Sequence, residues 1–399
     1  MRYYDYFKHN KNENKIFKTI PLKSFQKKLK DDEIFIDYFN SGFSHCLIIT
    51  NSDTKFFRLD DKIRDETEKI DKSILSFDYL SFVESGDALF QILFSKIKLN
   101  KYKRIIVSPQ YFLEVLPFEC LLKSKKNCEQ NDYRKLDYLV KTHEIEYCLS
   151  PLFFRNSKPK SYDFEISVFT PNFPKTFSSL PFSKLFAKKV NKEMKGKIFD
   201  GKKADLVNFH HNSSTILHLN SHSIIDNQNA ENSFILFKNK RLNVSEVKPN
   251  RAKLIVLNTC SSGNGVIRAG DGSEGFLKSF IYKGNPTVMT NLWAVDDKKS
   301  NELFYSFYKF LDEGKSTVMA LNSAKRTAIE KAINSKSASP YYWGAPRVVG
   351  EEINFNYSTQ GFVLYLILFG SATVLIFIMA YLYSKKKGDK RMSNYHQNL

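Results

Sequence analysis

The feature that most constrains the fold is a run of four consecutive apolar residues, 254–257 (LIVL), which ends shortly before Cys260. Such a run without polar alternation is typical of a strand that is buried on both faces of a parallel sheet. A second strand of this kind is predicted at residues 215–219 (TILHL), and His222 follows it closely. The two runs together predict an α/β fold, because a sheet buried on both faces needs covering helices.

Cys260 and His222 each lie just beyond the carboxyl end of one of these strands. Open α/β sheets bind their ligands at this edge, so the two side chains meet in one crevice if the strands are parallel neighbours. A thiol beside an imidazole is the minimal equipment for nucleophilic acyl transfer. The glycine-rich turn after Cys260, which includes Gly263, would let backbone amides approach an oxyanion. A buried, inert thiol is the alternative interpretation of Cys260.

A second histidine, His218, lies four residues before His222. This spacing suits a metal on a helix, but the run TILHL is strand-like and no acidic residue lies between the two histidines. We therefore expect neither a metal nor another cofactor, and we interpret His218 as a core residue with satisfied hydrogen bonds.

Strands and helices alternate along most of the chain. At the front, short apolar runs between turn residues predict a small β-meander, followed by a helical region and a buried strand: 34–39, 46–50, 54–59, 62–97 and 104–107. A strand pair is predicted at 138–147. Further strands are predicted at 166–169, 198–199, 215–219, 254–257 and 287–292, and helices at 183–194, 204–209, 275–281, 300–311 and 318–333. This order predicts a mostly parallel sheet with helices on both faces, preceded by a small meander and helical subdomain.

The composition of the chain argues against several classes of site and partner but does not indicate a function. The chain has 399 residues, a formal charge of +19 and five cysteines without a CxxC pair. No disulfide framework or structural zinc site is indicated. The lysines are spread along the chain, and no helix-turn-helix, zinc-finger or RNA-binding signature accompanies them, so no nucleic acid partner is expected. A basic nucleic-acid binder stays as a weaker alternative.

Residues 361–383 form an uncharged and almost wholly apolar segment. As a helix, the segment would be about 34 Å long, which exceeds the ~30 Å hydrocarbon core of a membrane. It is followed by the basic run SKKKGDKR. We therefore expect one C-terminal transmembrane helix and a single-pass membrane protein, with the side of the large domain left open.

Five motifs in this order and spacing resemble the CHAT domain, a caspase-like family of cysteine peptidases: LHLNSHS, LIVLNTCSSG, RAGDGSEGFLKSFIYKG, VMTNLWAVDD and SPYYWGAPRVVGE. The front meander and the motif LPFE resemble the amino-terminal half of that family. The resemblance covers about residues 34–350. It implies an amino-terminal half at 34–160 and a catalytic half at 161–350, which leaves an extension at 1–33, the membrane helix at 361–383 and a basic tail at 384–399 outside it.

The resemblance assigns the family's catalytic dyad to His222 and Cys260, with an oxyanion held by the amides of Cys260 and Ser223. The family usually has glycine where this chain has Ser223, and a left-handed backbone there would strain a serine. Asp296 and Asp297 resemble the edge of the family's substrate pocket, where one of them would face a basic substrate residue. Their alternative role is to cap the helix that begins near residue 300.

These features predict a membrane-anchored cysteine endopeptidase whose partner is a protein or peptide substrate. Relatives act in defence or cell-death systems when triggered, so the resemblance implies an activating sensor, which would be a partner or residues 1–33. The alternative is a catalytically degenerate CHAT fold that serves as a membrane-bound interaction module.

Overall fold

The computed structural model describes residues 20–40, 42–154, 160–226, 232–238, 240–259, 266–268, 272–356 and 378–379, with only the backbone of 266–268 and 272–274. The chain divides into two compact units, Met1–Asn356 and Tyr357–Leu399. Apart from Ile378 and Met379, the predicted membrane segment 361–383 lies outside the described residues. Within the described residues, no helix has the length and apolar character needed to cross a membrane.

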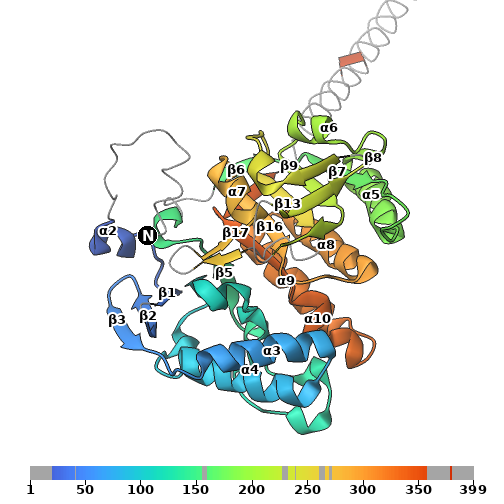
Figure 1. Ribbon diagram of the computed structural model, residues 1–399. Helices are drawn as coiled ribbons and strands as arrows, with labels where there is room; N and C mark the ends of the chain where they lie inside the picture. Colours follow the sequence, from blue (N-terminus) through green and yellow to red (C-terminus); the bar gives the residue numbers. More distant parts are fainter. Residues whose placement is uncertain are drawn as a thin grey trace, which may run out of the picture. The chain divides into compact units, whose positions relative to one another are not determined.

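A sheet of 11 strands organises the first unit (Figure 1), in the order β3-β2-β1-β4-β5-β17-β16-β13-β9-β7-β8. Its strands are β1 Glu33–Asn40, β2 Ser44–Ile49, β3 Thr54–Arg58, β4 Arg104–Ser108, β5 Glu144–Tyr147, β7 Ile166–Pro171, β8 Lys197–Gly201, β9 Ile216–Asn220, β13 Leu254–Asn258, β16 Thr287–Asn291 and β17 Pro346–Gly350. Smaller sheets are formed by β10 Ser223–Ile224, β11 Phe234–Phe237 and β12 Lys240–Asn243, by β14 Val266–Arg268 and β15 Gly272–Glu274, and by β6 Lys160–Asp163 and β18 Ile353–Asn356.

The large sheet consists of two parallel blocks of opposite direction. Strands β16, β13, β9, β7 and β8 run parallel to one another. Strands β17, β5, β4 and β1 are also mutually parallel, and the antiparallel pair β16–β17 joins the two blocks. The predicted mostly parallel sheet is therefore confirmed. Every residue of β9 and β13 is buried, as the unbroken apolar runs indicate.

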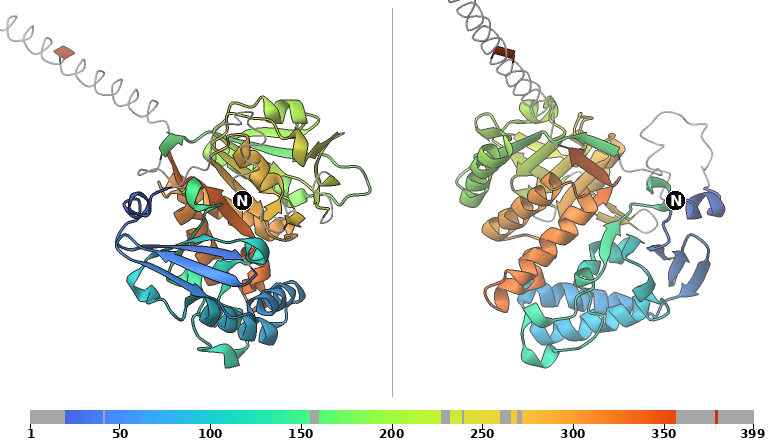
Figure 2. Two further views of the ribbon diagram at one scale, coloured as in Figure 1. Left: turned by 60° about the vertical axis from the view of Figure 1, so that its left-hand side comes forward. Right: turned by 180° about the vertical axis from the view of Figure 1, so that it is seen from behind.

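Helices cover both faces of this sheet. They are α2 Leu22–Gln26, α3 Ile63–Ser76, α4 Tyr79–Phe94, α5 Pro181–Met194, α6 Leu206–His210, α7 Phe276–Tyr282, α8 Asp297–Asp312, α9 Thr317–Glu330 and α10 Pro340–Trp343. Helices α8 and α9 lie side by side, as the view from behind in Figure 2 shows in orange. Helix α5 contacts α8, so these three helices form one layer.

Aromatic contacts identify which helix covers which face of the sheet within residues 161–350. His218 on β9 lies against Phe186 of α5 and Tyr308 of α8. Phe169 on β7 contacts Phe209 of α6, which in turn contacts Phe280 of α7. Phe169 is one residue beyond the register partner of His218, and successive strand residues point to opposite faces. Helices α5 and α8 therefore cover one face, and α6 and α7 cover the other.

The predicted front meander continues the large sheet instead of preceding it. Strands β1, β2 and β3 pair antiparallel as a meander, and β1 also pairs parallel with β4. Because β4 and β5 join the strands of residues 161–350 through β17, both predicted halves share one sheet and one compact unit. The predicted strand pair at 138–147 is wrong: only β5 is a strand there, and Tyr138 forms an isolated bridge with Leu122.

Candidate active site

The carboxyl ends of β9 and β13 form the floor of the candidate site. The two strands are parallel neighbours, and their last residues, Asn220 and Asn258, are register partners. The backbone N–H of Ser221 donates to the carbonyl of Asn258 at 3.4 Å, which keeps the strand ends together. His222 and Cys260 each follow two residues after this last pair. Cys260 itself, like Gly263, lies outside the described residues, and Thr259 before it is buried.

His222 is held at this edge from two sides. Its carbonyl accepts a hydrogen bond from the backbone N–H of Leu236 on β11 at 2.9 Å. Its ring nitrogen Nε2 lies 2.9 Å from the carbonyl oxygen of Ser178, in the loop between β7 and α5. Because a carbonyl oxygen only accepts, Nε2 carries the proton and donates. The neutral ring therefore keeps Nδ1 as its basic nitrogen, so that a proton can be taken up there.

Aromatic side chains of the same loop orient the imidazole. The ring centroid of Phe173 lies 4.6 Å from that of His222 in an edge-to-face arrangement. The ring of Phe177 lies 5.4 Å away and is tilted by 33°. An imidazole packed against two rings and bonded to a carbonyl has little rotational freedom, which is a requirement for a general base.

A groove of about 410 Å³ opens beside this loop. It is lined by the end of β7, the loop to α5, the first turn of α5 and the end of β9: Thr170, Pro171, Asn172, Phe173, Pro174, Lys175, Phe177, Ser178, Ser179, Leu180, Ser183, Lys184 and Asn220. Phe173, Phe177 and Ser178 contact His222 as well, so the groove adjoins the imidazole. An extended substrate bound near His222 therefore has a place for a side chain.

A buried hydrogen-bond network lies beneath the strand ends. The hydroxyl of Tyr308 lies 2.8 Å from Nδ1 of His218, and Nε2 of His218 lies 3.1 Å from Oδ1 of Asn220. The same Oδ1 accepts from Nδ2 of Asn258 at 2.6 Å, and Nδ2 of Asn291 donates to Oδ1 of Asn258 at 3.2 Å. The prediction that His218 is a satisfied core residue is confirmed. Burial lowers the pKa of His218 to about 3, so it stays neutral at physiological pH.

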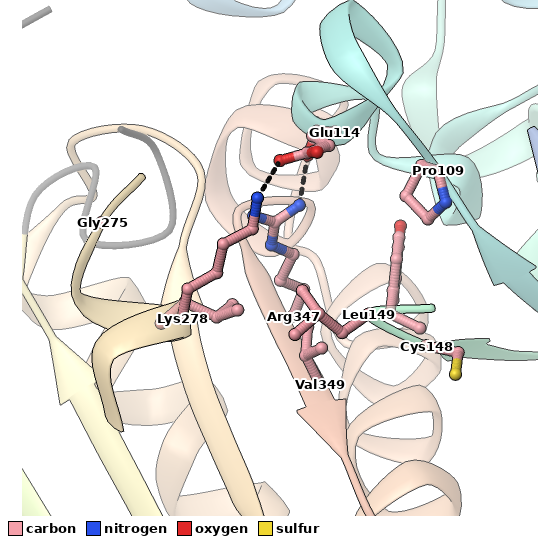
Figure 3. Close-up of a pocket in the computed structure, with 10 residues that line it drawn as sticks. Pro109, Glu114, Cys148, Leu149, Gly275, Lys278, Arg347 and Val349 are labelled. Atoms are coloured by element: carbon pink, nitrogen blue, oxygen red, sulfur yellow. Dashed lines mark hydrogen bonds and ion pairs between the residues drawn. The ribbon is translucent and has the colours of Figure 1, made fainter. Parts of the chain in front are cut away.

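A smaller cavity, of about 30 Å³, lies between the two halves of the chain. Figure 3 shows Lys278 from α7 and Arg347 from β17 converging on Glu114. Nζ of Lys278 lies 3.6 Å from the Glu114 carboxylate, and the Arg347 guanidinium donates to the Glu114 carbonyl. At about one water molecule in size, this cavity is too small for a substrate side chain. The contacts around this cavity join the amino-terminal half, through Glu114, to α7 and β17.

The comparison with known families settles the relationship. The model of the CHAT domain matches residues 83–351, which is more than half of the chain. The chain belongs to the CHAT family. The match begins at residue 83, whereas the resemblance was expected to begin at about residue 34. It supports the caspase-like cysteine peptidase fold that the motifs of this CHAT chain predict.

Solved structures similar to the CHAT chain are distant. One is a chain of the separase–securin complex of Saccharomyces cerevisiae, solved at 2.6 Å resolution, with a TM-score of 0.47 and 12% sequence identity. The match covers 83% of the present chain and 31% of the separase-complex chain. A complex of the pro- and mature domains of Porphyromonas gingivalis RgpB has a TM-score of 0.39 and 10% identity, over 73% and 75% of the two chains. This chain therefore spans about a third of the separase chain. No curated protein matches it.

Ser223, where the CHAT family usually has glycine, has an ordinary backbone in this chain. It lies in β10 and pairs with Ile235 of β11 in an antiparallel ladder. It is not one of the residues with a left-handed backbone, such as Phe77 and Tyr111. The expected strain is therefore absent, because the extended strand conformation is open to any residue.

Asp296 and Asp297 have structural partners at the start of α8. The carboxylate of Asp296 accepts from the backbone N–H of Lys299 at 2.8 Å and caps the helix. The carboxylate of Asp297 accepts from the N–H of Phe182 at 2.9 Å and from the hydroxyl of Ser183 at 2.7 Å. Asp297 thus joins the first turns of α8 and α5. Neither lines the groove, and a contact of either with substrate stays a prediction.

Sequence reasoning missed several groups of the site. The carbonyl of Ser178 has no signature, because any residue supplies one. Asn220, Asn258 and Asn291 each occupy the last position of a strand. That repeated asparagine at three neighbouring strand ends was a signal that could have been found. The described residues contain no group of three or more His, Cys, Asp or Glu side chains suited to a metal ion.

Proposed function

We propose that this CHAT chain is a cysteine endopeptidase that uses His222 and Cys260. The observation that carries the proposal is the donation of Nε2 of His222 to the Ser178 carbonyl, which leaves Nδ1 as the basic nitrogen at the strand edge. The register of β9 and β13 supports it, since Cys260 follows the paired residue Asn258 at the same distance along the chain. Family membership supports it independently.

In the proposed reaction, the sulfur of Cys260 attacks the carbonyl carbon of a peptide bond and forms a tetrahedral intermediate. Backbone amides near Ser223 and Cys260 would hold its oxyanion. The imidazole of His222 takes the thiol proton and passes it to the leaving amine as the carbon–nitrogen bond breaks. Water then attacks the thioester, which releases the second product and restores the thiol.

Cleavage-site mapping across a proteome tests this function. We expect the full chain to generate new protein amino termini that a Cys260→Ala variant does not generate. A thiol-reactive peptide probe should label the wild type and not this variant. If the purified chain cleaves protein substrates only after cell extract is added, the result would support an activating partner. Identical termini from the wild type and the variant would refute the peptidase and favour the degenerate interaction module.

We also propose that residues 361–383 anchor the chain in a membrane. The support is the uncharged composition and the length of the segment, with the basic run after it. We expect the full chain to stay with membranes after carbonate extraction and a chain ending at Asn356 to be released, because the first unit is compact without the segment. An Ala372→Arg change near the middle should weaken anchoring, at about 2.5–3.5 kcal/mol for one central charge. Release of the full chain would contradict the proposal.

A further inference from the structure

Beside His222, the groove is lined by a residue with a buried hydrogen-bond donor. The side chain of Asn220 is fully buried and lines the groove, and its Nδ2 has no hydrogen-bond partner among the described residues. A buried amide donor that stays unpaired destabilises the fold. Such a group in a pocket is a place where a ligand can supply the missing acceptor.

The orientation of this amide follows from its neighbours. Nδ2 of Asn291 donates to the carbonyl of Thr259 and to Oδ1 of Asn258, so Asn258 faces Asn220 with its own Nδ2, beside Nε2 of His218. Nε2 then donates to Asn220, and Nδ2 of Asn258 donates to the same atom. Two donors require an oxygen between them, so this atom is Oδ1 and the NH₂ group is the free end. Flipping this amide alone would turn its NH₂ group toward Nδ2 of Asn258, donor against donor.

The charges around the groove favour an anionic ligand. Among the described residues, its lining includes two cations, Lys175 and Lys184, and no carboxylate. The charge of Lys184 is matched by Asp200, whose carboxylate lies 3.4 Å away. Lys175 is exposed and, in the part of the chain that the structure describes, forms no ion pair. An acidic ligand would thus find one unmatched cation and one unpaired donor among the described residues that line the groove.

Resting on the proposed peptidase function, we propose that this groove is a subsite for an acidic substrate side chain, aspartate or glutamate, with Asn220 as the specificity-determining residue. The carboxylate accepts from Nδ2 of Asn220, and its remaining charge faces Lys175. This assignment differs from the expectation of a basic substrate residue facing Asp296 or Asp297, whose carboxylates are occupied by α8 and α5.

A binding experiment tests the subsite without catalysis. The probes are N-acetyl, N′-methylamide derivatives of aspartate, asparagine, leucine and lysine, titrated into the full-length Cys260→Ala chain in detergent. We expect the aspartate probe to bind about tenfold more tightly than the leucine probe. Asn220→Asp keeps the buried oxygen for His218 and Asn258 but replaces the donor by an acceptor. In the Cys260→Ala background it should remove the aspartate preference and favour lysine.

Tyr308→Phe is the matched control, because it removes the other end of the network and leaves the groove lining unchanged. It should keep the aspartate preference, and an equal loss in both variants would mean that Asn220 acts only through the core. Equal binding of aspartate and leucine, or tighter binding of asparagine than aspartate, would overturn the acidic subsite. Cleavage mapping separates the two proposals. Cleavage without any acidic preference refutes the subsite alone, and aspartate binding without cleavage refutes the peptidase alone.

Discussion

Replacing His222 by alanine should lower kcat for peptide hydrolysis about 10²–10⁴-fold, the range typical of a lost general acid–base group. The structure gives the reason, since the ring is aligned by the Ser178 carbonyl and by two phenylalanine rings with Nδ1 left basic. The loss should fall on kcat and kcat/KM together, because the proton transfer is made in the transition state and not in substrate binding. Steady-state kinetics on a peptide found by cleavage mapping measures it.

The matched control for this change is His211→Ala, which removes an exposed histidine beyond the end of α6. It should leave kcat and KM unchanged. Thermal unfolding of both variants shows whether the fold is intact, which the partial exposure of His222 leads us to expect. Wild-type kcat in a folded His222→Ala variant would exclude His222 from the chemistry and leave Cys260 without its base.

Replacing Lys325 by methionine should destabilise the first unit by about 3–5 kcal/mol, because it leaves the carboxylate of Glu119 buried without a counter-charge. The Lys325 ammonium on α9 is fully buried and lies 2.6 Å from the Glu119 carboxylate, which also accepts from the hydroxyl of Tyr147. Glu119 belongs to the LPFE motif of the amino-terminal half. This pair therefore connects the two halves. Denaturant unfolding of the two chains measures the difference.

The surface pair Lys299–Glu302 provides the control, with a similar separation of 2.8 Å but side chains 37% and 51% exposed. Lys299→Met should cost at most about 1 kcal/mol, because water already screens the pair. The double variant Glu119→Gln with Lys325→Met should lose less stability than Lys325→Met alone, since no buried charge remains. A small effect of Lys325→Met, equal to that of Lys299→Met, would contradict the assigned role of the buried pair.

Local patterns predicted the elements of residues 161–350 well, and they did so for a physical reason. The runs at 215–219 and 254–257 are apolar throughout because β9 and β13 are covered on both faces. The helices predicted at 183–194, 300–311 and 318–333 likewise correspond to α5, α8 and α9. The pattern failed at 138–147, where buried apolar residues such as Leu139 and Val140 lie in a 3₁₀ turn and not in a strand. Burial alone produces an apolar run, whatever the backbone conformation.

The amino-acid sequence by itself determined the α/β class, the family and the two residues proposed to act in catalysis, because these depend on residue types at short, ordered spacings. Only the tertiary structure decided which nitrogen of His222 is basic, that Ser223 is unstrained, and that Asp296 and Asp297 serve helix starts. It also revealed the unpaired donor of Asn220 and the single sheet shared by both halves. These properties arise from contacts between segments far apart in the chain, such as Ser178 with His222, and no local pattern encodes such contacts.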